Sequence, residues 1–507
     1  MVLKVLTVDI GTTNVKAAVV DERGRILKVS SRELKLLTPE PGAAEHSPQE
    51  IVRAVGETAK LAAKRLEVDA VALTCYQHGL MLVDREGRPI TNALTHMDSR
   101  SGPYAARVEE LCDPRELYER TGCPPLFVYA LPKILWFKAR RPNIAREAKY
   151  FLLVKDYLVL NAVGEPYIDY GNASGSQLFN IRQLRWDDLA LEIAGIAEDR
   201  LATPAEGAEV LCLLKGRGAE LFGVNPGTPL VLGTFDGAGQ NFGYLIEKPE
   251  LAVVNLGTTA VLRALAREPL LDIKGMRVFC YYAAAGRWAF GGSTNNGGSV
   301  LRWFRDVLGA PETIVASLLE MSPYDLLTRE AELAPPGSGG LMFLPFMAGE
   351  RFPFRDPYSR GVLLGLRYDH RKCHIVRAFM EGVAMVLKSI LLVLEELGVA
   401  PKVLVGGGGG LRSRLWAEII ANATCKQLLK VRGGEYASNK GAAALAFKAL
   451  GAVKNLQELG WELEVEERVT PRPELCALYK ELYREFMEAY ETLAPLFRKW
   501  STASLPT

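Results

Sequence analysis

The sequence predicts an α/β protein of two domains with similar topology, and two observations support this prediction. A pattern of apolar strand, Gly-Thr-Thr turn and second strand occurs twice, with its glycines at Gly11 and Gly257, about half the chain apart. Each half then mixes the alternation of strands with the spacing of helices. Self-similarity over so long a period is typical of a duplicated domain. The expected domains are residues 1–248 and 249–507, joined by a charged turn at residues 247–250.

Composition excludes several other classes of protein. Hydrophobic residues make up 49% and charged residues 24% of the 507 residues, which are globular values. Lys and Arg (61) nearly balance Asp and Glu (59), so nothing indicates a nucleic-acid partner. No apolar run is long enough to span a bilayer, and no secretory leader is visible at the start. The eight cysteines show no C-x-x-C spacing, so we expect reduced thiols and a cytoplasmic protein.

The first half is expected to open with a β-hairpin over residues 5–21. Helical spacing of apolar residues follows over 48–66. Residues 69–74 read as a buried strand, and residues 80–83 read as a strand that ends in a turn at 84–87.

The second half is expected to open with the repeated hairpin over residues 251–264. A long amphipathic helix is predicted over 375–397, and the basic run at 370–374 is interpreted as its solvated start rather than a phosphate site. A strand over 402–405 leads into five glycines and a helix over 416–423. The closing helix is expected over 473–499, and residues 333–340 read as a loop.

The two Gly-Thr-Thr turns are candidate phosphate-binding loops. Such a turn offers closely spaced backbone N–H groups and hydroxyls, which suit phosphate oxygens. A single copy is equally explained as a tight hairpin, but two matched copies favour a grip on one polyphosphate. Asp9, two residues before the first turn, would suit a water-mediated Mg²⁺ contact. Lys16 would reach a transferred phosphoryl group, or else is a surface lysine.

The glycine run at residues 406–410 lies between a strand and a helix, where nucleotides often bind. It lacks both the Walker A lysine and the G-x-G-x-x-G fingerprint, so neither a P-loop nor a Rossmann site is expected. The alternative is a close crossing of helix and strand.

Polar residues at the ends of strands are candidates for catalysis and substrate binding. Asp236 lies in a glycine-flanked turn after a strand, where a carboxylate can act as a general base, or else caps an Asx turn. Gln77 and His78 close one strand, and His96 and Asp98 close another. Polyhydroxylated ligands need several such donors and acceptors, although His78 is equally explained as a core histidine.

The order of these motifs resembles the FGGY family of carbohydrate kinases over nearly the whole chain. The segments that carry the resemblance are Asp9–Thr13, Gln77–Gly79, Asp98–Arg100, Asp169–Ser174, Asp236–Gly237, Gly257–Thr259, Gly349–Arg351, Arg377–Val383, Gly408–Gly409 and Ser413.

The resemblance implies two similar actin/Hsp70-like (ribonuclease H-like) domains facing a central nucleotide cleft, and ATP-dependent phosphorylation of a hydroxyl on a sugar, polyol or sugar acid. By position, Asp236 matches the family's catalytic base. The nucleotide side is implied to comprise Gly11, Thr12, Thr13, Lys16, Gly257, Thr258, Gly408, Gly409 and Ser413. The acceptor side is implied to comprise Gln77, His78, His96, Asp98 and Asp236. Mg²⁺ would accompany ATP near Asp9.

Two branches of the family compete for the acceptor. The stretch from Thr121 to Trp136 and the turn at 295–298 look most like gluconate kinases, while His78-Gly79 also suits xylulose kinases. Gln77 and His96 stand where these branches usually carry other residues. The expected partner is a small sugar, polyol or aldonate, with no nucleic acid or membrane, and a homodimer is the assembly considered. The rival function is a nucleotide-switched binding protein of the actin or Hsp70 type without a sugar substrate.

Overall fold

The computed structural model describes residues 2–244 and 250–502, so most of the predicted junction at 247–250 lies outside the described residues. The chain forms two compact units. The first contains residues 1–247, 265–290 and 436–463, and the second contains residues 248–264, 291–435 and 464–507. Two segments from the second half of the sequence therefore belong to the first unit, which a single division at residue 248 does not provide for.

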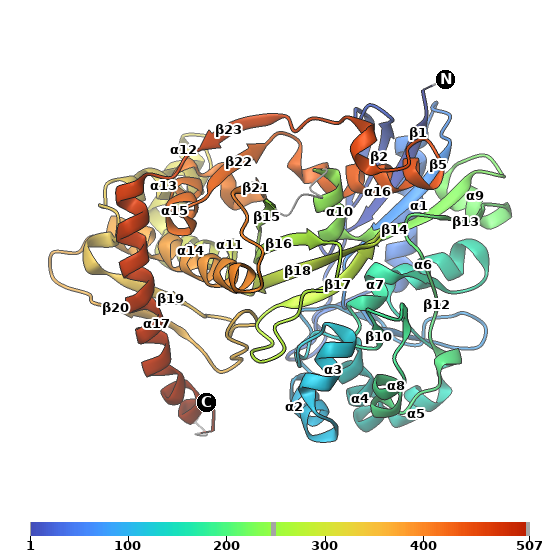
Figure 1. The fold of residues 1–507 in the computed structure, drawn as a ribbon, viewed down its shortest axis with the longest axis horizontal. Helices are drawn as coiled ribbons and strands as arrows, with labels where there is room; N and C mark the ends of the chain where they lie inside the picture. Colours follow the sequence, from blue (N-terminus) through green and yellow to red (C-terminus); the bar gives the residue numbers. More distant parts are fainter. Residues whose placement is uncertain (1, 245–249, 503–507) are drawn as a thin grey trace. The chain divides into compact units, whose positions relative to one another are not determined.

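The first unit is built on a six-stranded sheet with the order β13-β14-β5-β1-β2-β3 (Figure 1). Strand β2 lies between β1 and β3 and is antiparallel to both, whereas β5 and β14 run parallel to β1. The turn at Gly11 joins β1 to β2, so the predicted hairpin is confirmed. The bounds are β1 Lys4–Ile10, β2 Asn14–Asp21, β3 Ile26–Glu33, β5 Ala70–Cys75, β13 Val210–Leu213 and β14 Pro229–Phe235.

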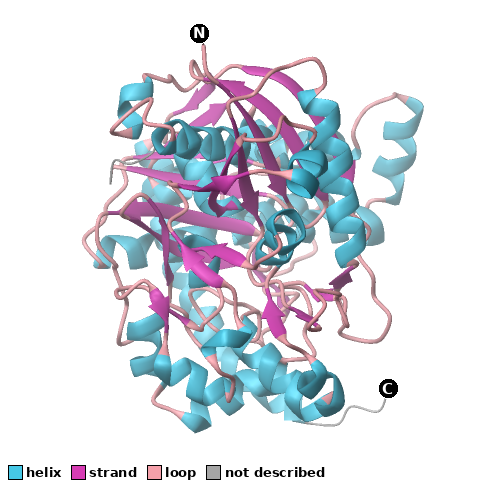
Figure 2. Ribbon diagram, turned by 90° about the vertical axis from the view of Figure 1, so that its right-hand side faces the viewer, coloured by secondary structure: helices cyan, strands magenta, loops and turns pink. Residues whose placement is uncertain are grey.

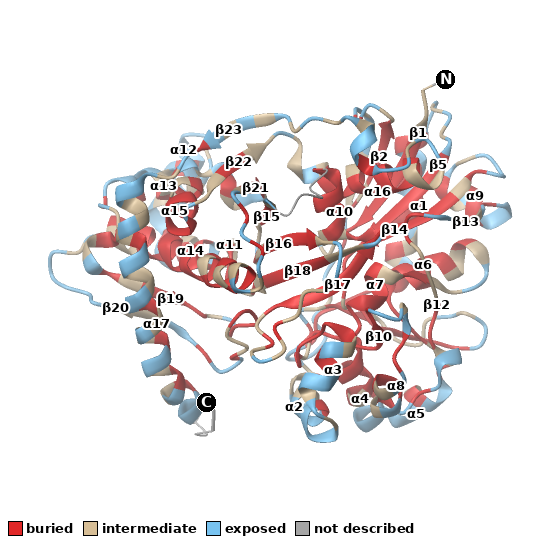
Figure 3. Ribbon diagram, in the orientation of Figure 1, coloured by how far each residue is buried: buried red, intermediate tan, exposed pale blue. Residues whose placement is uncertain are grey.

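Both faces of this sheet are covered, because successive side chains of a strand point to opposite faces. Leu6, Val8 and Ile10 of β1 pack with the helices on one face, while Val5 packs on the other face against Phe447. The inner strands β1, β2, β5 and β14 are accordingly mostly buried, whereas the edge strands β3 and β13 are partly exposed (Figure 3). The first face is covered by α1 Pro48–Ala63, α6 Val154–Val163 and α9 Gly216–Phe222, and the second by α16 Ala437–Ala449.

Further short elements of the first unit surround the ends of the strands. They are β4 Glu45–His46, β6 Met81–Val83, β7 Ala93–Leu94, α2 Gly102–Leu111, α3 Pro114–Thr121, α4 Ala130–Arg140, α5 Pro142–Glu147, β8 Tyr150–Leu152, β9 Tyr167–Asp169, α7 Tyr170–Ser174, β10 Phe179–Asn180, β11 Arg185–Trp186, α8 Asp188–Ala194, β12 Thr203–Ala205, α10 Asp236–Gly243 and β17 Phe279–Ala284. Both helices and strands contribute to the structure, as Figure 2 shows.

The sheet of the second unit repeats the topology of the first. Its strands belong to a seven-stranded sheet with the order β17-β18-β16-β15-β21-β22-β23. Strand β15 is antiparallel to β16 and parallel to β21, β21 is parallel to β22, and β23 returns antiparallel, as β13 does beside β14. The internal repeat read from the sequence is thus confirmed in the topology. The bounds are β15 Leu251–Leu256, β16 Ala260–Ala266, β18 Arg287–Thr294, β21 Val403–Gly407, β22 Gln427–Val431 and β23 Val465–Val469.

The predicted helices of the second unit are also confirmed. The long amphipathic helix is α14 Lys372–Glu396, the helix after the glycine run is α15 Arg414–Thr424, and the closing helix is α17 Pro473–Thr502. The remaining elements are α11 Gly298–Leu308, α12 Ala310–Leu318, α13 Pro323–Glu332, β19 Met342–Pro345 and β20 Gly361–Leu364. Within the described residues, none of the helices has the length and apolar character required to cross a bilayer.

Candidate functional site

The carboxyl ends of three parallel strands meet in the first unit, and the candidate catalytic residues lie there. In β1 and β5, Asp9 is the register partner of Thr74, and Thr74 is in turn the partner of Thr234 in β14. Asp236 follows β14 directly. Ligands of open α/β sheets bind beyond the carboxyl ends of parallel strands, so this edge is the natural place for a site.

Asp9 is almost completely buried at this edge. The Thr74 hydroxyl donates to Asp9 Oδ1 at 2.8 Å, and Lys16 is the residue opposite Asp9 in the β1–β2 hairpin. Burial raises the pKa of the Asp9 carboxyl, while the Thr74 hydrogen bond and the charges of Lys16 and Lys155 lower it. Burial outweighs these contacts, so the pKa of Asp9 is raised, and the Thr74 hydrogen bond holds the carboxyl group beside the first Gly-Thr-Thr turn.

The first Gly-Thr-Thr turn is tight, and the side chain of His46 packs against it. The Gly11 N–H donates to the Asn14 carbonyl at 2.9 Å, and a Cβ on Gly11 would lie 3.0 Å from that oxygen. Thr13 is exposed, and Thr12 is half-buried. The buried His46 ring reaches this turn: its Nδ1 is 3.0 Å from the Tyr76 hydroxyl, and a contact with the Thr12 backbone acts on its pKa.

Sequence reasoning did not select His46, because nothing in its local sequence marks it. Burial lowers the pKa of this histidine to about 4, so the ring is neutral at physiological pH. The neutral His46 ring therefore adds no positive charge to the first turn, where the backbone N–H groups carry partial positive charge.

Asp236 is the first residue of helix α10, not part of an isolated strand-end turn. The Gly237 N–H donates to Asp236 Oδ1 at 2.6 Å, and the Ser438 hydroxyl donates to the Asp236 carbonyl at 3.1 Å. The partial positive charge at a helix N-terminus stabilises a carboxylate at this position. This bond joins adjacent residues, whereas an Asx turn joins the side chain to the N–H two residues on.

A buried ion pair holds the strand end that carries Asp236. Lys155 Nζ lies 2.6 Å from Asp169 Oδ2 and donates to the carbonyls of Leu232 and Thr234 at 2.8 Å each. Lys155 and Asp169 are both inaccessible to solvent. Burial raises the pKa of Asp169, and the Lys155 charge lowers it. The pair therefore holds the end of strand β14, just before Asp236. Of the two residues, the sequence had pointed only to Asp169.

Helix α7 joins this strand end to the predicted acceptor-side residues. Asp169 caps the helix by accepting from the Asn172 N–H at 2.8 Å. Gln77 donates to the Gly171 carbonyl at 2.9 Å, and His78 Nδ1 is 2.7 Å from the Gly175 carbonyl. His78 also adopts a left-handed backbone conformation with φ of 68°. Such strain at a non-glycine residue often accompanies a functional constraint.

Lys133 brings the two acceptor-side segments together. Its Nζ donates to the carbonyls of His78 and Thr95, the latter at 2.8 Å, and Thr95 immediately precedes His96. The side chain is inaccessible to solvent, and burial lowers its pKa to about 7. A neutral amine has two N–H bonds to donate, which matches the two carbonyls. His78 and His96 thus belong to segments held at one point.

Asp98 is placed differently from the other predicted acceptor ligands. It is inaccessible to solvent, accepts from the Ala44 N–H at 3.0 Å and pairs with Arg100 at 2.7 Å. Arg100 also contacts Glu40 and Glu45. The Asp98 carboxylate is thus engaged by protein groups, which supports a role in shaping this loop rather than in touching the acceptor.

Two tyrosines beside His78 were missed by sequence reasoning. The hydroxyls of Tyr129 and Tyr281 are 2.8 Å apart, and both rings meet the His78 ring edge-on, with centroids 5.2 and 6.1 Å away. Tyr281 lies in β17, which follows the second Gly-Thr-Thr turn in sequence but belongs to the first unit. No local pattern places it beside His78.

The nucleotide-side residues of the second unit line one cavity of about 400 Å³. Gly257, Thr258, Gly409 and Ser413 all contribute to its wall. Ser413 caps α15 by accepting from the Trp416 N–H at 3.2 Å. The other lining residues, which sequence reasoning did not select, are Gly298, Leu301, Arg302, Ser322, Tyr324, Asp325, Thr328, Gly410, Arg412 and Trp416.

Arg302 gives this cavity a positive charge at the second turn. Its guanidinium donates to Thr258 Oγ1 at 2.9 Å from helix α11. An arginine that holds the hydroxyl of a Gly-Thr turn is suited to phosphate oxygens. The polar wall, the positive charge and the volume match a nucleotide.

Gly408 has a different role from its neighbours in the glycine run. It does not line the cavity, and its φ is 95°. A Cβ there would lie 2.6 Å from the Leu256 carbonyl oxygen and 2.5 Å from Asn255 Oδ1. Gly408 therefore packs its backbone against the end of strand β15, where a side chain would not fit.

The structure thus gathers the predicted residues into two sets. Asp9, Lys16, Gln77, His78 and Asp236 surround one sheet edge in the first unit, with the His96 segment attached through Lys133. Gly257, Thr258, Gly409 and Ser413 line a cavity in the second unit. The described residues hold no group of three or more His, Cys, Asp or Glu side chains able to bind a metal on their own.

The duplicated α/β topology, the buried carboxylates at one sheet edge and the polar cavity beside a Gly-Thr turn define a nucleotide-dependent phosphotransferase. Family models confirm this class. The model described as the FGGY family of carbohydrate kinases, N-terminal domain, matches residues 4–243, and the C-terminal domain model matches residues 252–450. The chain belongs to the FGGY family of carbohydrate kinases, and it phosphorylates a sugar or sugar acid at the expense of ATP.

Individual relatives are similar along their whole length. A gluconokinase from Bacillus subtilis (strain 168) is 34% identical over 497 residues, which are 97% of this chain and 94% of the relative. A xylulose kinase from Escherichia coli (strain K12) is 28% identical over 96% of this chain and 99% of the relative. The gluconate kinase structure from Lactobacillus acidophilus has a TM-score of 0.91 at 26% identity, and covers 99% of this chain and 100% of that one. The expected two-domain α/β kinase fold is confirmed.

Proposed function

We propose that the acceptor is an aldonate of the gluconate type and that Asp236 is the general base. The observation that carries the acceptor is the order of similarity: gluconokinases from two Bacillus species are 34% and 33% identical to this chain, whereas the xylulose kinase from Escherichia coli is 28% identical. The hydroxyls of Tyr129 and Tyr281 beside His78 support a polyhydroxylated acceptor, because they add donors and acceptors to that segment.

Asp236 would accept the proton of the attacking hydroxyl as that oxygen attacks the γ-phosphorus in line. Phosphoryl transfer needs positioning and neutralisation of charge rather than covalent help from the protein. Lys155 and Asp169 position the strand end before Asp236, and the Ser438 hydroxyl holds its carbonyl. Each Gly-Thr-Thr turn, at Gly11 and at Gly257, is proposed to bind phosphate oxygens of ATP.

Mg²⁺ fits this proposal. Magnesium is usually held by phosphate oxygens, waters and one or two carboxylates rather than by a full protein cage. Asp9 supplies one carboxylate next to the first turn, and the lack of a larger cluster among the described residues suits such a site. When bound with ATP, the ion neutralises phosphate charge. A cytoplasmic location and a homodimer stay predictions.

The acceptor is tested by measuring ADP release with D-gluconate, D-xylulose, glycerol and no added acceptor. We expect kcat/KM for gluconate to exceed that for xylulose by about tenfold or more, because polar groups left unpaired by the wrong acceptor are costly. A higher kcat/KM for xylulose or glycerol would overturn the aldonate assignment. ADP release that no acceptor stimulates would instead favour the nucleotide-switched alternative.

A further inference from the structure

Two cysteines of the second unit line a cavity that shares no lining residue with the nucleotide-side cavity of that unit. Cys425 is exposed and ends helix α15 in a left-handed conformation with φ of 54°. Cys476 is half-buried near the start of α17. The Cys425 side chain is near enough to Cys476 to raise the pKa of the Cys476 thiol. Both line one cavity of about 390 Å³, together with Lys388 and Lys480.

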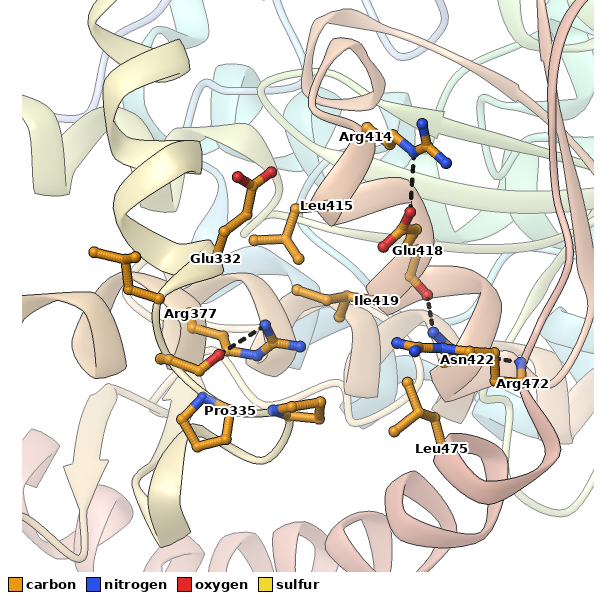
Figure 4. A pocket seen from close by; sticks show the side chains of 13 residues that line it. Glu332, Pro335, Arg377, Arg414, Leu415, Glu418, Ile419, Asn422, Arg472 and Leu475 are labelled. Carbon is orange, nitrogen blue, oxygen red and sulfur yellow. Dashed lines mark hydrogen bonds and ion pairs between the residues drawn. The ribbon is translucent and has the colours of Figure 1, made fainter.

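Backbone hydrogen bonds fix the two cysteines in this arrangement. The Arg472 N–H donates to Asn422 Oδ1 at 2.8 Å, a contact that joins the chain before α17 to α15 (Figure 4). The Cys425 N–H donates to the Asn422 carbonyl at 3.3 Å, and the Cys476 N–H donates to the Arg472 carbonyl at 2.9 Å. Each cysteine is therefore three or four residues from the same contact between α15 and the chain before α17, and both cysteines line one cavity there.

The two thiols differ in their surroundings. Burial, together with the Cys425 thiol, raises the pKa of Cys476 to about 12, and the nearby Lys388 charge lowers it. The Cys476 thiol therefore stays protonated at neutral pH until Cys425 forms a mixed disulfide that Cys476 can attack. Cys425 is the one that solvent and small molecules reach. An exposed thiol with a second thiol poised beside it is the arrangement of a reversible dithiol.

We propose that Cys425 and Cys476 form a reversible intramolecular disulfide when the protein meets a small-molecule disulfide such as oxidised glutathione. The Cys425 thiolate attacks one sulfur of that molecule, its S–S bond breaks, and one small thiolate leaves. Cys476 loses its proton to solvent and attacks the Cys425 sulfur of the mixed disulfide, which releases the second small thiolate. Two protein thiols are oxidised, and one small disulfide is reduced to two thiols.

The bond would enclose the segment that returns to the first unit. Residues 436–463 belong to that unit and lie between the two cysteines in the chain. A disulfide restrains the unfolded chain more strongly when the loop that it closes is long. The oxidised protein should therefore unfold at a higher temperature than the reduced protein, by about 5–10 °C.

The test uses the full chain, incubated with oxidised glutathione, alkylated without reduction and digested with trypsin. We expect mass spectrometry to recover one linked pair of peptides, containing Cys425 and Cys476, and dithiothreitol to reverse both the link and the rise in Tm. Cys425→Ser and Cys476→Ser should each lose the link and the shift, while Cys112→Ser, at a half-buried cysteine of the first unit, should keep both.

Recovery of Cys425 only as its glutathione adduct, with Cys476 still free, would overturn the proposal.

Discussion

The lowered pKa of Lys133 offers a direct test, because it should make the stability of the protein depend on pH. The pKa of Lys133 is about 7 in the folded protein, and about 10.4 is normal for an exposed lysine. Between these values the unfolded chain binds more protons than the folded one. The free energy of unfolding should therefore rise with pH across this window, by up to about 1.4 kcal/mol per pH unit.

Replacing Lys133 by methionine should flatten that rise, since the titrating group is gone. Urea unfolding at about pH 7.5 and about pH 9.5 measures the slope for both proteins. Lys138→Met is the matched control, because Lys138 lies on the same helix, α4, and is exposed. Equal slopes in wild type and Lys133→Met would show that Lys133 is charged in the folded protein.

Lys155 is predicted to act on Asp236 without touching the acceptor. In Lys155→Met, the buried Asp169 carboxylate loses its counter-charge and two carbonyls lose their donor. Loss of one partner from a buried pair typically costs about 3–5 kcal/mol. We expect lower stability and a lower kcat, because the strand end before Asp236 loosens.

The double variant Lys155→Met/Asp169→Leu separates two effects, the positioning of the strand end before Asp236 and the cost of an unpaired buried charge. It removes both charges, so stability should partly recover while kcat stays low. Denaturant unfolding and steady-state kinetics measure the two effects. A wild-type kcat in either variant that remains folded would exclude the positioning role.

Among the elements, the crossing of helices α10 and α16 controls where Asp236 lies. A Cβ on Gly441 of α16 would come within 1.9 Å of the Gly239 carbonyl oxygen of α10, and one on Gly243 would meet the Ala437 carbonyl at the same distance. The two helices therefore pack backbone against backbone, and only glycine permits this at the crossing. Asp236 begins one of these helices.

Gly441→Ala should push α10 away and displace Asp236. Overpacking of this kind costs about 1–3 kcal/mol. We expect a lower Tm and a reduced kcat, with the loss of kcat present even at temperatures where the variant is folded. Gly102→Ala is the control, because a Cβ on Gly102, the first residue of α2, meets nothing within 4 Å. Similar kcat values for the two variants would argue against control of Asp236 by this crossing.

Elements with a strong local pattern were predictable from the sequence. The repeated hairpins, α1, α14, α15 and α17 appear within a few residues of their expected positions, because periodicity and turn residues specify them locally. The start of α10 at Asp236 was not predicted, since its glycine-rich sequence resembles a turn. Packing against α16, which comes from a segment some 200 residues later, stabilises α10 as a helix.

At the scale of the whole molecule, what local sequence could not reveal is which distant segments join the first unit. Tyr281 and α16 follow the second Gly-Thr-Thr turn in sequence yet complete the first unit. Likewise, Lys133 and Lys155 gave no local signal, because their partners are carbonyls and carboxylates from other segments. The candidate residues next to strand ends were found, whereas the residues that hold those strand ends were visible only in the structure.

The central claim is that this kinase transfers phosphate to its acceptor with Asp236 as the base, and Asp236→Asn tests it most directly. The measurement is kcat for gluconate-dependent ADP release, with ATP binding measured on the same preparation. Loss of a positioned base should lower kcat about 10²–10⁴-fold. ATP affinity should hold, because the asparagine keeps the size of the side chain. Asp188→Asn, at the exposed first residue of helix α8, should keep wild-type kcat. A near wild-type kcat in Asp236→Asn would contradict the account.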